Sequence, residues 1–401
     1  EEMINNIITN VKDNVSSSLV NIINGTGIVL HTGFGRAPFN GERLRQIADK
    51  LDGYVNLEYD LINNHRGDRQ KHINEHISSI CDVESSLIVN NNAAALLLTI
   101  NTLADDSEVI CSRGQIVEIG GSFRISEIIE KGGAILKEVG ATNRTHIDDY
   151  ESAITDKTKM LIWVHTSNYI LKGYTKEVPL EEIVKLGKKY NIAVLADLGS
   201  GTFLSLDKFG VPSEKPLIEI VKKDPDIILF SGDKMLGGPQ SGIILGSKDI
   251  TNQIKTNTLY RTVRCDKITI AMLDQIIRTY TRNGFSNLNL TLSLLTSTRK
   301  DLEKIGNKIV NNISSKKIKM LGLTVEESFV EAGSGSLPEK NIESIALKFN
   351  SSVLNANKLS LLFKQAEVPI IGYIKKEFFF IDLKAILPSQ ISKIIATINN
   401  I

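Results

Sequence analysis

Short apolar runs alternate with helical patterns through the middle of this chain. The runs are rich in Val, Ile and Leu and stop at Gly, Asn, Asp or Ser, as the strands of a buried sheet do. Between them, apolar residues recur at helical spacing, for example over Leu180–Tyr190. This alternation predicts an α/β fold with a large, mostly parallel sheet that is covered by helices on both faces. The expected strands are Ser86–Val89, Glu108–Cys111, Met160–His165, Ile192–Ala196, Ile227–Phe230 and Gly242–Leu245.

The two ends of the chain have different patterns. Apolar residues at helical spacing over residues 3–23 predict an amphipathic helix. A helical pattern over Asp266–Arg282 precedes a mixed region that contains the apolar run Glu377–Leu383. We therefore expect an N-terminal helix or linker over 1–22, a core domain over 23–290 and a small α+β domain over 291–401.

Composition narrows the function classes. The chain has 401 residues, 42% of them apolar, and a formal net charge of +1, so it has no overall field that would attract DNA or RNA. Three widely spaced cysteines fit the reduced thiols of a cytoplasmic enzyme. No run approaches the ~18 apolar residues of a membrane span. No histidine, cysteine and carboxylate spacing suits a metal, so we expect none.

Lys234 follows the apolar strand that ends at Phe230, in the sequence Ser231-Gly232-Asp233-Lys234. This is the carboxyl edge of the predicted sheet, where open α/β folds bind ligands. Partial withdrawal from water lowers the pKa of a lysine and makes its amine nucleophilic. A surface lysine in a turn explains the same four residues, so this motif alone does not decide.

Asp197 favours a ligand-binding role for Lys234 over a surface lysine in a turn. It ends the strand before that of Lys234, 37 residues earlier, and opens the turn Gly199-Ser200-Gly201. A carboxylate there can keep a pyridine nitrogen protonated, which pyridoxal-5′-phosphate (PLP) needs in order to act as an electron sink. An aspartate that caps a turn is the simpler alternative. Together, the two strand ends favour a PLP site in which Lys234 holds the cofactor as an imine.

A third strand end supplies a phosphate site. Asn91, Asn92 and Ala93 lie where a strand passes into an apolar helix. The free amides and the dipole of a helix start attract anions, so these residues, with Ser231, form the predicted seat of the cofactor phosphate. An ordinary asparagine cap is the alternative.

Weaker signals lie at neighbouring strand ends. His165 or Asn168 is expected to bind the phenolic oxygen of the cofactor, and Arg113 to contact its ring face; a structural histidine is an equal alternative. The pairs Arg66 with Arg69 and Arg261 with Arg264 suit phosphate-like oxyanions, although a solvated basic face is the commoner outcome for an arginine pair.

With these residues assembled, the sequence resembles bacterial L-seryl-tRNA(Sec) selenium transferases, the selenocysteine synthases. The matching segments occur in the same order from Ile23 onward. They are Ile23–Gly27, Gly35–Pro38, Asn56–Tyr59, Val89–Ala95, Ser112–Ile125, Val139–Thr145, Val164–Asn168, Asp197–Gly201, Ser231–Gly242, Arg264, Asp266, Lys267 and Gly335–Pro338.

The resemblance implies a PLP-dependent transferase of fold type I, with a seven-stranded sheet domain and a small C-terminal domain. It implies a homodimer as the smallest unit, with active sites at the dimer interface, and a homodecamer of five dimers. It also assigns Lys234 to the cofactor, and Arg36, Arg261 and Arg264 to the selenium donor or the substrate.

The sequence departs from the family at four places. Family members usually carry a further N-terminal domain that grips tRNA, and about 22 residues precede Ile23, so we expect the chain to lack most of that domain. Gly33-Phe34 stands where Asn-Leu is expected, Asp68 where Ser is expected, and Tyr373 where an arginine is usual. These changes bear on tRNA and donor specificity rather than on the PLP residues.

The resulting hypothesis is a selenium transfer to seryl-tRNA(Sec). Lys234 removes the Cα proton, the β-hydroxyl leaves as water to give an aminoacrylyl group, and selenophosphate delivers selenium to the β-carbon. Two alternatives stay open: a PLP lyase or β-eliminase that acts on a free amino acid or amino sugar derivative, and a non-catalytic tRNA-binding or assembly subunit.

Overall fold

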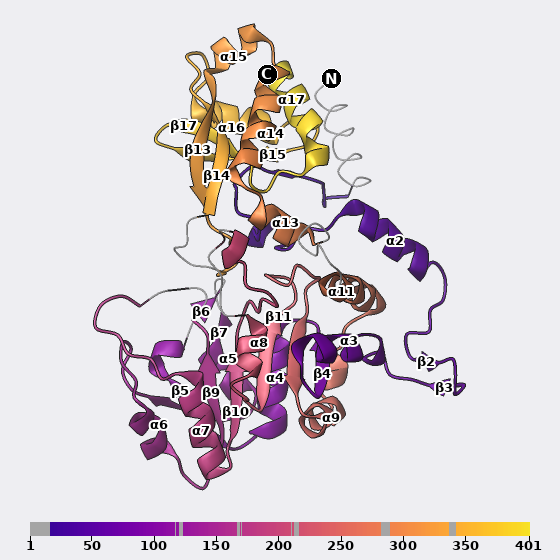
Figure 1. Ribbon diagram of the computed structural model, residues 1–401, viewed down its shortest axis with the longest axis vertical. Helices are drawn as coiled ribbons and strands as arrows, with labels where there is room; N and C mark the ends of the chain where they lie inside the picture. The colour runs from indigo at the N-terminus through magenta and orange to yellow at the C-terminus, as the bar shows by residue number, and fades with distance from the viewer. Residues whose placement is uncertain are drawn as a thin grey trace, which may run out of the picture. The chain divides into compact units, whose positions relative to one another are not determined.

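The computed structural model describes residues 17–116, 118–119, 123–166, 169, 171–209, 211, 216–281, 289–336 and 342–401. The chain forms two compact units (Figure 1). The larger unit is Val29–Thr296 with Glu331–Ile342, and the smaller unit is Glu1–Ile28, Ser297–Val330 and Glu343–Ile401. The division therefore falls at residues 28 and 296, rather than at the 22 and 290 that we expected. Residues 23–28 belong with the smaller unit because strand β1 (Ile23–Asn24) pairs in parallel with β15 (Ile370–Ile371).

Seven strands form the central sheet of the larger unit, in the order β4-β12-β11-β10-β9-β5-β8. β9, β10 and β11 are mutually parallel, as are β9, β5 and β8, whereas β12 runs antiparallel to both of its neighbours. Six of the seven strands therefore have their carboxyl ends at one edge. Their bounds are β4 (Ser85–Val89), β5 (Glu108–Ser112), β8 (Ile135–Val139), β9 (Thr158–Val164), β10 (Ala193–Asp197), β11 (Ile227–Ser231) and β12 (Gly242–Gly246).

Helices cover both faces of this sheet because side chains alternate along its strands. On β11, Ile228 and Phe230 pack into one apolar core, and Ile227 and Leu229 into the other. The first core holds α3 (Lys71–Cys81), α6 (Ile147–Ala153), α7 (Leu180–Tyr190), α8 (Leu217–Val221) and α11 (Lys267–Tyr280). The second holds α4 (Asn92–Leu103), α5 (Ile125–Lys131) and α9 (Lys248–Thr256). The predicted α/β class and the predicted helix 180–190 are confirmed.

Shorter elements complete the larger unit. Two small hairpins pair β2 with β3 and β6 with β7. The bounds are η1 (Thr32–Phe34), α2 (Gly41–Leu51), β2 (Tyr59–Asp60), β3 (His65–Arg66), η2 (Arg113–Gln115), β6 (Glu118–Ile119), β7 (Phe123–Arg124), η3 (Asp207–Phe209), α10 (Tyr260–Val263) and α13 (Leu290–Thr296).

The smaller unit has a four-stranded sheet in the order β13-β14-β17-β16. The rings of Phe349, Phe363 and Phe379 pack against one another, with centroids 5.2 to 5.7 Å apart, and lie in its apolar core. The predicted α+β character of this region is confirmed. Its bounds are α14 (Arg299–Asn311), α15 (Ser315–Leu321), β13 (Leu323–Val330), β14 (Ile342–Phe349), α16 (Ala356–Lys364), β16 (Tyr373–Lys375), β17 (Phe378–Asp382), η4 (Pro388–Gln390) and α17 (Ile391–Asn400).

The expected N-terminal helix over residues 3–23 is wrong at its end. Residues 17–22 are not helical and Ile23 opens β1; residues 1–16 lie outside the described part. Ser17 both donates to the carbonyl of Leu19 and accepts from its amide. Such local bonds compete with helical ones, so Ser17 favours a non-helical main chain here despite the apolar spacing.

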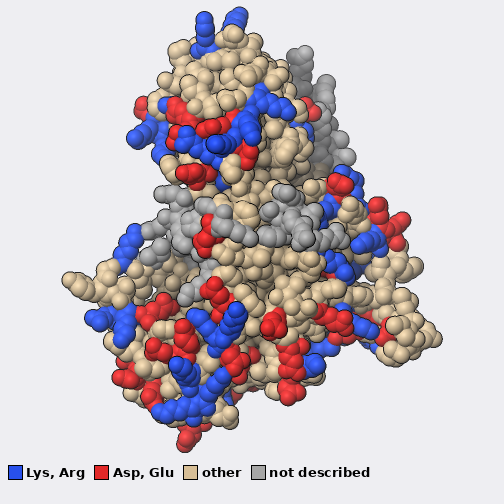
Figure 2. Space-filling view, viewed as in Figure 1, with Lys and Arg blue, Asp and Glu red and all other residues tan. Residues whose placement is uncertain are grey.

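Charge is mixed on the face shown in Figure 2, where Lys and Arg side chains lie among Asp and Glu. Within the described ranges, no helix is long and apolar enough to span a bilayer. The same ranges contain no group of three or more His, Cys, Asp or Glu placed to hold a metal ion.

Candidate active site

Lys234 lies in the hairpin loop between β11 and the antiparallel β12. The loop is closed at its base, where Ser231 pairs with Gly242 and the Gly232 amide donates to the carbonyl of Ser241 over 2.8 Å. A further bond from the Gly238 amide to the Gly232 carbonyl, 2.8 Å, folds the loop back on itself. Lys234 is only 6% exposed. The structure therefore holds a buried amine at the carboxyl edge of the sheet, in a loop braced by its own main chain.

Asp197 ends β10, the strand beside β11, and is 4% exposed. Its Oδ1 accepts from Asn92 Nδ2 over 2.9 Å and from the Gly199 amide over 3.0 Å. Burial raises the pKa of Asp197 above its usual range, and these two bonds and the charge of Lys234 oppose that rise. The carboxylate thus lies where an additional cationic N–H partner would stabilise its charge.

The start of α4 lies beside this carboxylate. Asn91 caps the helix by accepting from the Ala94 amide over 2.8 Å, and Asn92 reaches Asp197 as described above. In the described part of the chain, the buried Asn92 Oδ1 has no hydrogen-bond partner. A Cβ at Gly242 would lie 2.2 Å from the carbonyl oxygen of Asn91, so only glycine lets β12 approach this helix start so closely. Asn91 and Asn92 therefore join the anion-binding end of α4 to the carboxylate.

These three parts fit PLP. Lys234 would hold the aldehyde end, Asp197 would pair with the pyridine nitrogen, and the first turn of α4, beside Asn91, Asn92 and Ala93, would face the phosphate. Ser231 lies at the end of β11, directly before the lysine loop, and is buried.

The other residues predicted to contact the cofactor lie in different places in the structure. The main-chain amide of His165 donates to the Asp197 carbonyl over 2.8 Å, which places His165 at the site. Asn168 lies outside the described residues. Arg113 donates to Glu138 of β8 over 2.9 Å and to the Gly140 carbonyl over 3.2 Å. Since β8 lies on the far side of β5 from β10, the guanidinium of Arg113 is directed away from Asp197.

Arg36 is joined to the lysine loop. Its Nη1 donates to Asp233 Oδ2 over 2.7 Å, and the Ala37 amide donates to the Asp233 carbonyl over 3.3 Å. Asp233 is 6% exposed and directly precedes Lys234. The sequence did not single out Asp233, although an acid beside the key lysine was the available signal.

Three of the predicted arginines share one carboxylate. Glu58 accepts from Arg66 over 2.9 Å and from Arg69 Nε over 2.8 Å, and Arg264 lies 3.4 Å away. The hydrogen bond from Arg69 is the main reason why the pKa of Glu58 lies below its usual range. Arg69 also donates to the Cys265 carbonyl, so its guanidinium braces the protein. Sequence reasoning missed Glu58, although it lies in the matching segment 56–59.

This arginine group adjoins the phosphate end of the site. Arg264 forms an isolated antiparallel bridge with Val89, the last residue of β4, and the Asn90 amide donates to the Val263 carbonyl over 2.8 Å. Arg261 lies in the short helix α10 just before this bridge. Arg261 and Arg264 thus lie on a segment bound to the turn that opens α4.

The three departing positions have ordinary contacts. Phe34 stacks on His31 with ring centroids 3.8 Å apart, and Tyr373 stacks on Phe380 at 5.2 Å. Asp68 pairs with Lys255. None of these contacts involves Lys234 or Asp197.

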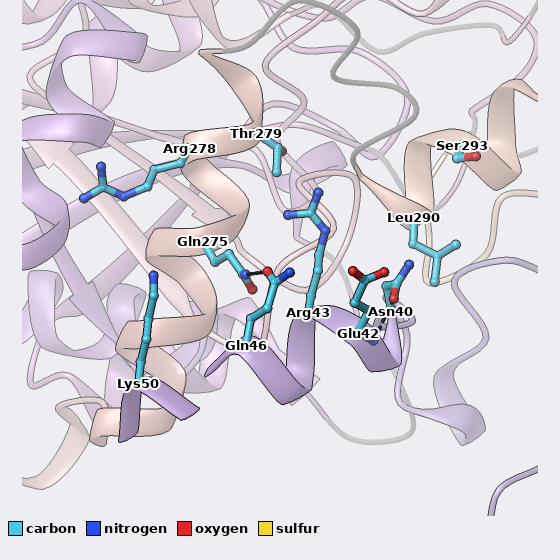
Figure 3. Close-up of a pocket in the computed structure, with 10 residues that line it drawn as sticks. All are labelled: Asn40, Glu42, Arg43, Gln46, Lys50, Gln275, Arg278, Thr279, Leu290 and Ser293. Carbon is cyan, nitrogen blue, oxygen red and sulfur yellow. Dashed lines mark hydrogen bonds between the residues drawn. The ribbon is translucent and has the colours of Figure 1, made fainter. Parts of the chain in front are cut away.

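Volume alone does not identify this site. A cavity of 510 Å³ lies between α2 and α11 (Figure 3). Arg43, Gln46 and Lys50 project into it from α2, and Gln46 accepts a 3.0 Å hydrogen bond from Gln275. None of the predicted site residues lines it.

The fold and the site together define a class. The larger unit has the α/β fold of fold-type I PLP enzymes, with the lysine and the aspartate on adjacent strand ends. D-Glucosaminate-6-phosphate ammonia-lyase has a solved structure of this fold; it is 18% identical to this chain, covers 97% of each chain and gives a TM-score of 0.66.

Sequence comparison is more specific. Residues 22–387 match the L-seryl-tRNA selenium transferase family, and the chain belongs to that family. The L-seryl-tRNA(Sec) selenium transferase of Alkaliphilus oremlandii is 39% identical over all of this chain and 86% of its own length. That of Carboxydothermus hydrogenoformans is 40% identical over 92% of this chain and 79% of its own length.

Proposed function

We propose that this protein converts seryl-tRNA(Sec) into selenocysteinyl-tRNA(Sec), with PLP as cofactor and selenophosphate as selenium donor. The observation that carries the proposal is the buried Lys234 beside Asp197, whose carboxylate Asn92 links to the start of α4, in a chain of this family. Overall, the β-hydroxyl of the seryl group leaves as water, selenium joins the β-carbon as the proton returns to Cα, and one water hydrolyses the Se–P bond and releases phosphate.

Lys234 and Asp197 do the central chemistry in this proposal. When bound, PLP withdraws electrons from the Cα of the seryl group and makes its proton acidic. Lys234 holds the cofactor before the reaction and then takes the Cα proton. Asp197 keeps a proton on the pyridine nitrogen, and Asn92 fixes the direction of that carboxylate. Because both residues are buried, the proton is held away from bulk water.

Arginines handle the anionic donor. Arg36 lies at the lysine loop, and Arg261 and Arg264 lie on the segment bound to the start of α4. Guanidinium forks bind phosphate oxygens in bidentate geometry, and they orient the selenium of selenophosphate toward the β-carbon. Arg66, 74% exposed at its side chain, extends this positive group. Arg69 supports it by holding Glu58.

A transfer assay tests the proposal. The PLP-loaded chain is incubated with seryl-tRNA(Sec) and selenophosphate, and selenium is measured on the recovered tRNA by mass spectrometry. We expect selenium on the tRNA with the wild type and none with Lys234→Ala. Free serine replaces the seryl-tRNA in a parallel reaction. Turnover of free serine without any transfer to tRNA would favour the small-molecule lyase, and transfer by Lys234→Ala would overturn the assignment of the lysine.

We also propose a cytoplasmic location, where the tRNA substrate is found, and a homodimer as the smallest active unit. Leu61 and Ile62, between β2 and β3, are 73% and 88% exposed, and large apolar side chains in adjacent positions favour a protein contact. Light scattering on the purified chain tests the dimer, and a monomer at micromolar concentration would contradict it. The decamer of five such dimers is the further arrangement that the same measurement would detect.

A further inference from the structure

A second cavity, of about 290 Å³, opens beside the candidate active site. Its walls are the loops that follow β5, β8 and β9. β9 is the direct neighbour of β10, which ends in Asp197, and β5 and β8 follow in the sheet. With strands roughly 4.8 Å apart, the cavity lies about 5 to 14 Å along the sheet edge from the strand of Asp197. It therefore adjoins the reacting centre without including it.

The cavity is built by specific hydrogen bonds. At its buried end, Ser112 Oγ and Thr145 Oγ1 lie 2.7 Å apart. Gln115, 2% exposed, accepts from the Val164 amide over 3.1 Å and donates to Glu177 over 2.7 Å. The walls are thus fixed before any ligand arrives, which lowers the entropic cost of binding.

The two opposing loops also meet closely. A Cβ at Gly114 would lie 2.6 Å from the Thr142 carbonyl oxygen, so a glycine is required where these loops approach. The Thr145 amide donates to the Lys176 carbonyl over 3.0 Å, and the Lys176 amide to the Asn143 carbonyl over 2.9 Å. These bonds join the loop after β8 to the segment that precedes α7.

The lining combines one aromatic ring and one leucine with polar groups, two basic side chains and the carboxylate of Glu177, which accepts from Gln115. Tyr169 is half-buried, and its hydroxyl donates to the Gly114 carbonyl, which fixes the ring. Arg144 and Lys176 are exposed and line the cavity together with Asn143. Asn143 Nδ2 donates to the Tyr174 carbonyl over 2.8 Å, and Lys176 Nζ lies 3.1 Å from His146 Nδ1. An aromatic face, hydrogen-bonding amides and cations at the mouth are the groups that bind a base, its edges and a phosphate.

We propose that this cavity binds the terminal nucleoside of the seryl-tRNA. The inference rests on the proposed function and deepens it. The seryl group is joined to that nucleoside by a single ester, so the two must bind within a few ångströms of each other. The volume lies near the lower limit of ligand pockets, roughly 300 to 1,000 Å³, and suits one nucleoside. The base stacks on Tyr169, and Arg144 and Lys176 meet the phosphate that leads into the rest of the tRNA.

Adenosine 5′-monophosphate (AMP) is the probe, because it presents a base, a ribose and one phosphate without an aminoacyl group. Its binding to the PLP-loaded chain is measured by saturation-transfer NMR and titration, for the wild type, Tyr169→Leu and Tyr174→Leu. Tyr174 is the matched control, since it lies five residues further along the same segment between β9 and α7, its side chain is exposed, and it does not line the cavity. We expect AMP affinity to fall by about tenfold or more in Tyr169→Leu and to be unchanged in Tyr174→Leu. The KM for seryl-tRNA(Sec) should rise by a similar factor in Tyr169→Leu alone.

Several outcomes would overturn the assignment. The first is no AMP binding by the wild type, and the second is an equal loss of AMP affinity in both variants. The third is that ribose 5-phosphate competes with AMP as well as unlabelled AMP does, which would indicate an anion site without base recognition. The results distinguish a failure of the proposed function from a failure of the nucleoside site. If AMP binds as expected but no selenium reaches the tRNA, the proposed function fails and the nucleoside site stands. If selenium is transferred and Tyr169→Leu behaves like the wild type, the nucleoside site fails and the function stands.

Discussion

Arg36 holds Asp233, the residue before Lys234, through a 2.7 Å ion pair between Nη1 and Oδ2. The main chain repeats this contact, since the Ala37 amide donates to the Asp233 carbonyl. Arg36 itself has φ of 61°, in the left-handed region that non-glycine residues seldom adopt. The segment that carries this arginine is therefore fixed against the loop of the reactive amine.

Arg36→Ala should weaken use of the selenium donor. A charge-assisted hydrogen bond to an oxyanion contributes about 1.5 to 3 kcal/mol, so the KM for selenophosphate should rise roughly 10- to 100-fold. Arg36→Lys keeps the charge but loses the fork, and it should recover only part of this loss. The measurement is transfer rate against selenophosphate concentration. Arg45→Ala, an exposed arginine of α2, is the control, and an equal KM in both variants would show that Arg36 has no such role.

Asp197→Asn should lower the transfer activity while removing one pH-dependent loss of stability. The amide cannot keep the pyridine nitrogen protonated, so transfer should fall by at least about a hundredfold. In the cofactor-free chain, however, the pKa of Asp197 is raised by burial, so the folded state binds its proton more tightly than the unfolded state does. The wild type should therefore lose stability as pH rises above the unfolded value of 3.8, and Asp197→Asn should lack this loss. Thermal unfolding of both cofactor-free chains across pH tests the sign.

Lys384 gives a second pH dependence, in the smaller unit. Its Nζ is 2.9 Å from the Ser297 carbonyl and 3.3 Å from that of Glu343, and burial lowers its pKa to about 8. In the unfolded chain the pKa of this lysine is 10.5, so the unfolded state binds the proton more tightly than the folded state does. The free energy of unfolding should therefore increase as pH rises from about 8 to 10.5.

The Lys384 effect is measured against Lys384→Met, which removes the titrating group and keeps most of the apolar stem. Between pH 8 and 10, the free energy of unfolding of the wild type should increase relative to that of the variant by about 1 to 2 kcal/mol. A difference that stays flat over this range would contradict the lowered pKa.

Gly242→Ala should disturb the phosphate end of the site. Its Cβ would lie 2.2 Å from the Asn91 carbonyl oxygen, so the start of α4 must shift. We expect a loss of about 1 to 3 kcal/mol in stability and a clear fall in PLP affinity, followed by the absorbance of the bound cofactor. Gly41→Ala in α2, where the nearest atom is 3.7 Å away, serves as the comparison and should retain normal affinity.

Local pattern predicted most of the sheet because its central strands each contain a run of buried apolar residues. The strand that was not predicted, β8, lies at the sheet edge, and its Lys137 and Glu138 interrupt the apolar run. Lys234 and Asp197 were accessible from sequence because parallel strands bring their carboxyl ends together. Asp233 and Glu58 were not. The arginine partner of Asp233, Arg36, is 197 residues away. Arg66 and Arg69 are only 8 and 11 residues from Glu58, but their spacing alone does not show that the chain folds back through β2 and β3 to bring them to that carboxylate. The folded chain creates such ion pairs, and local patterns do not encode them.

The antiparallel β12 has a consequence for how the enzyme recovers its cofactor. Because Ser231 and Gly242 are paired at the base of the loop, the ten residues between them form a short closed ring that carries Lys234. The loop that carries the amine therefore loses its conformational entropy when the chain folds, and PLP binding need not order it again. A chain stripped of PLP should reload by simple encounter, at a rate set by collision and bond formation rather than by reordering of the loop.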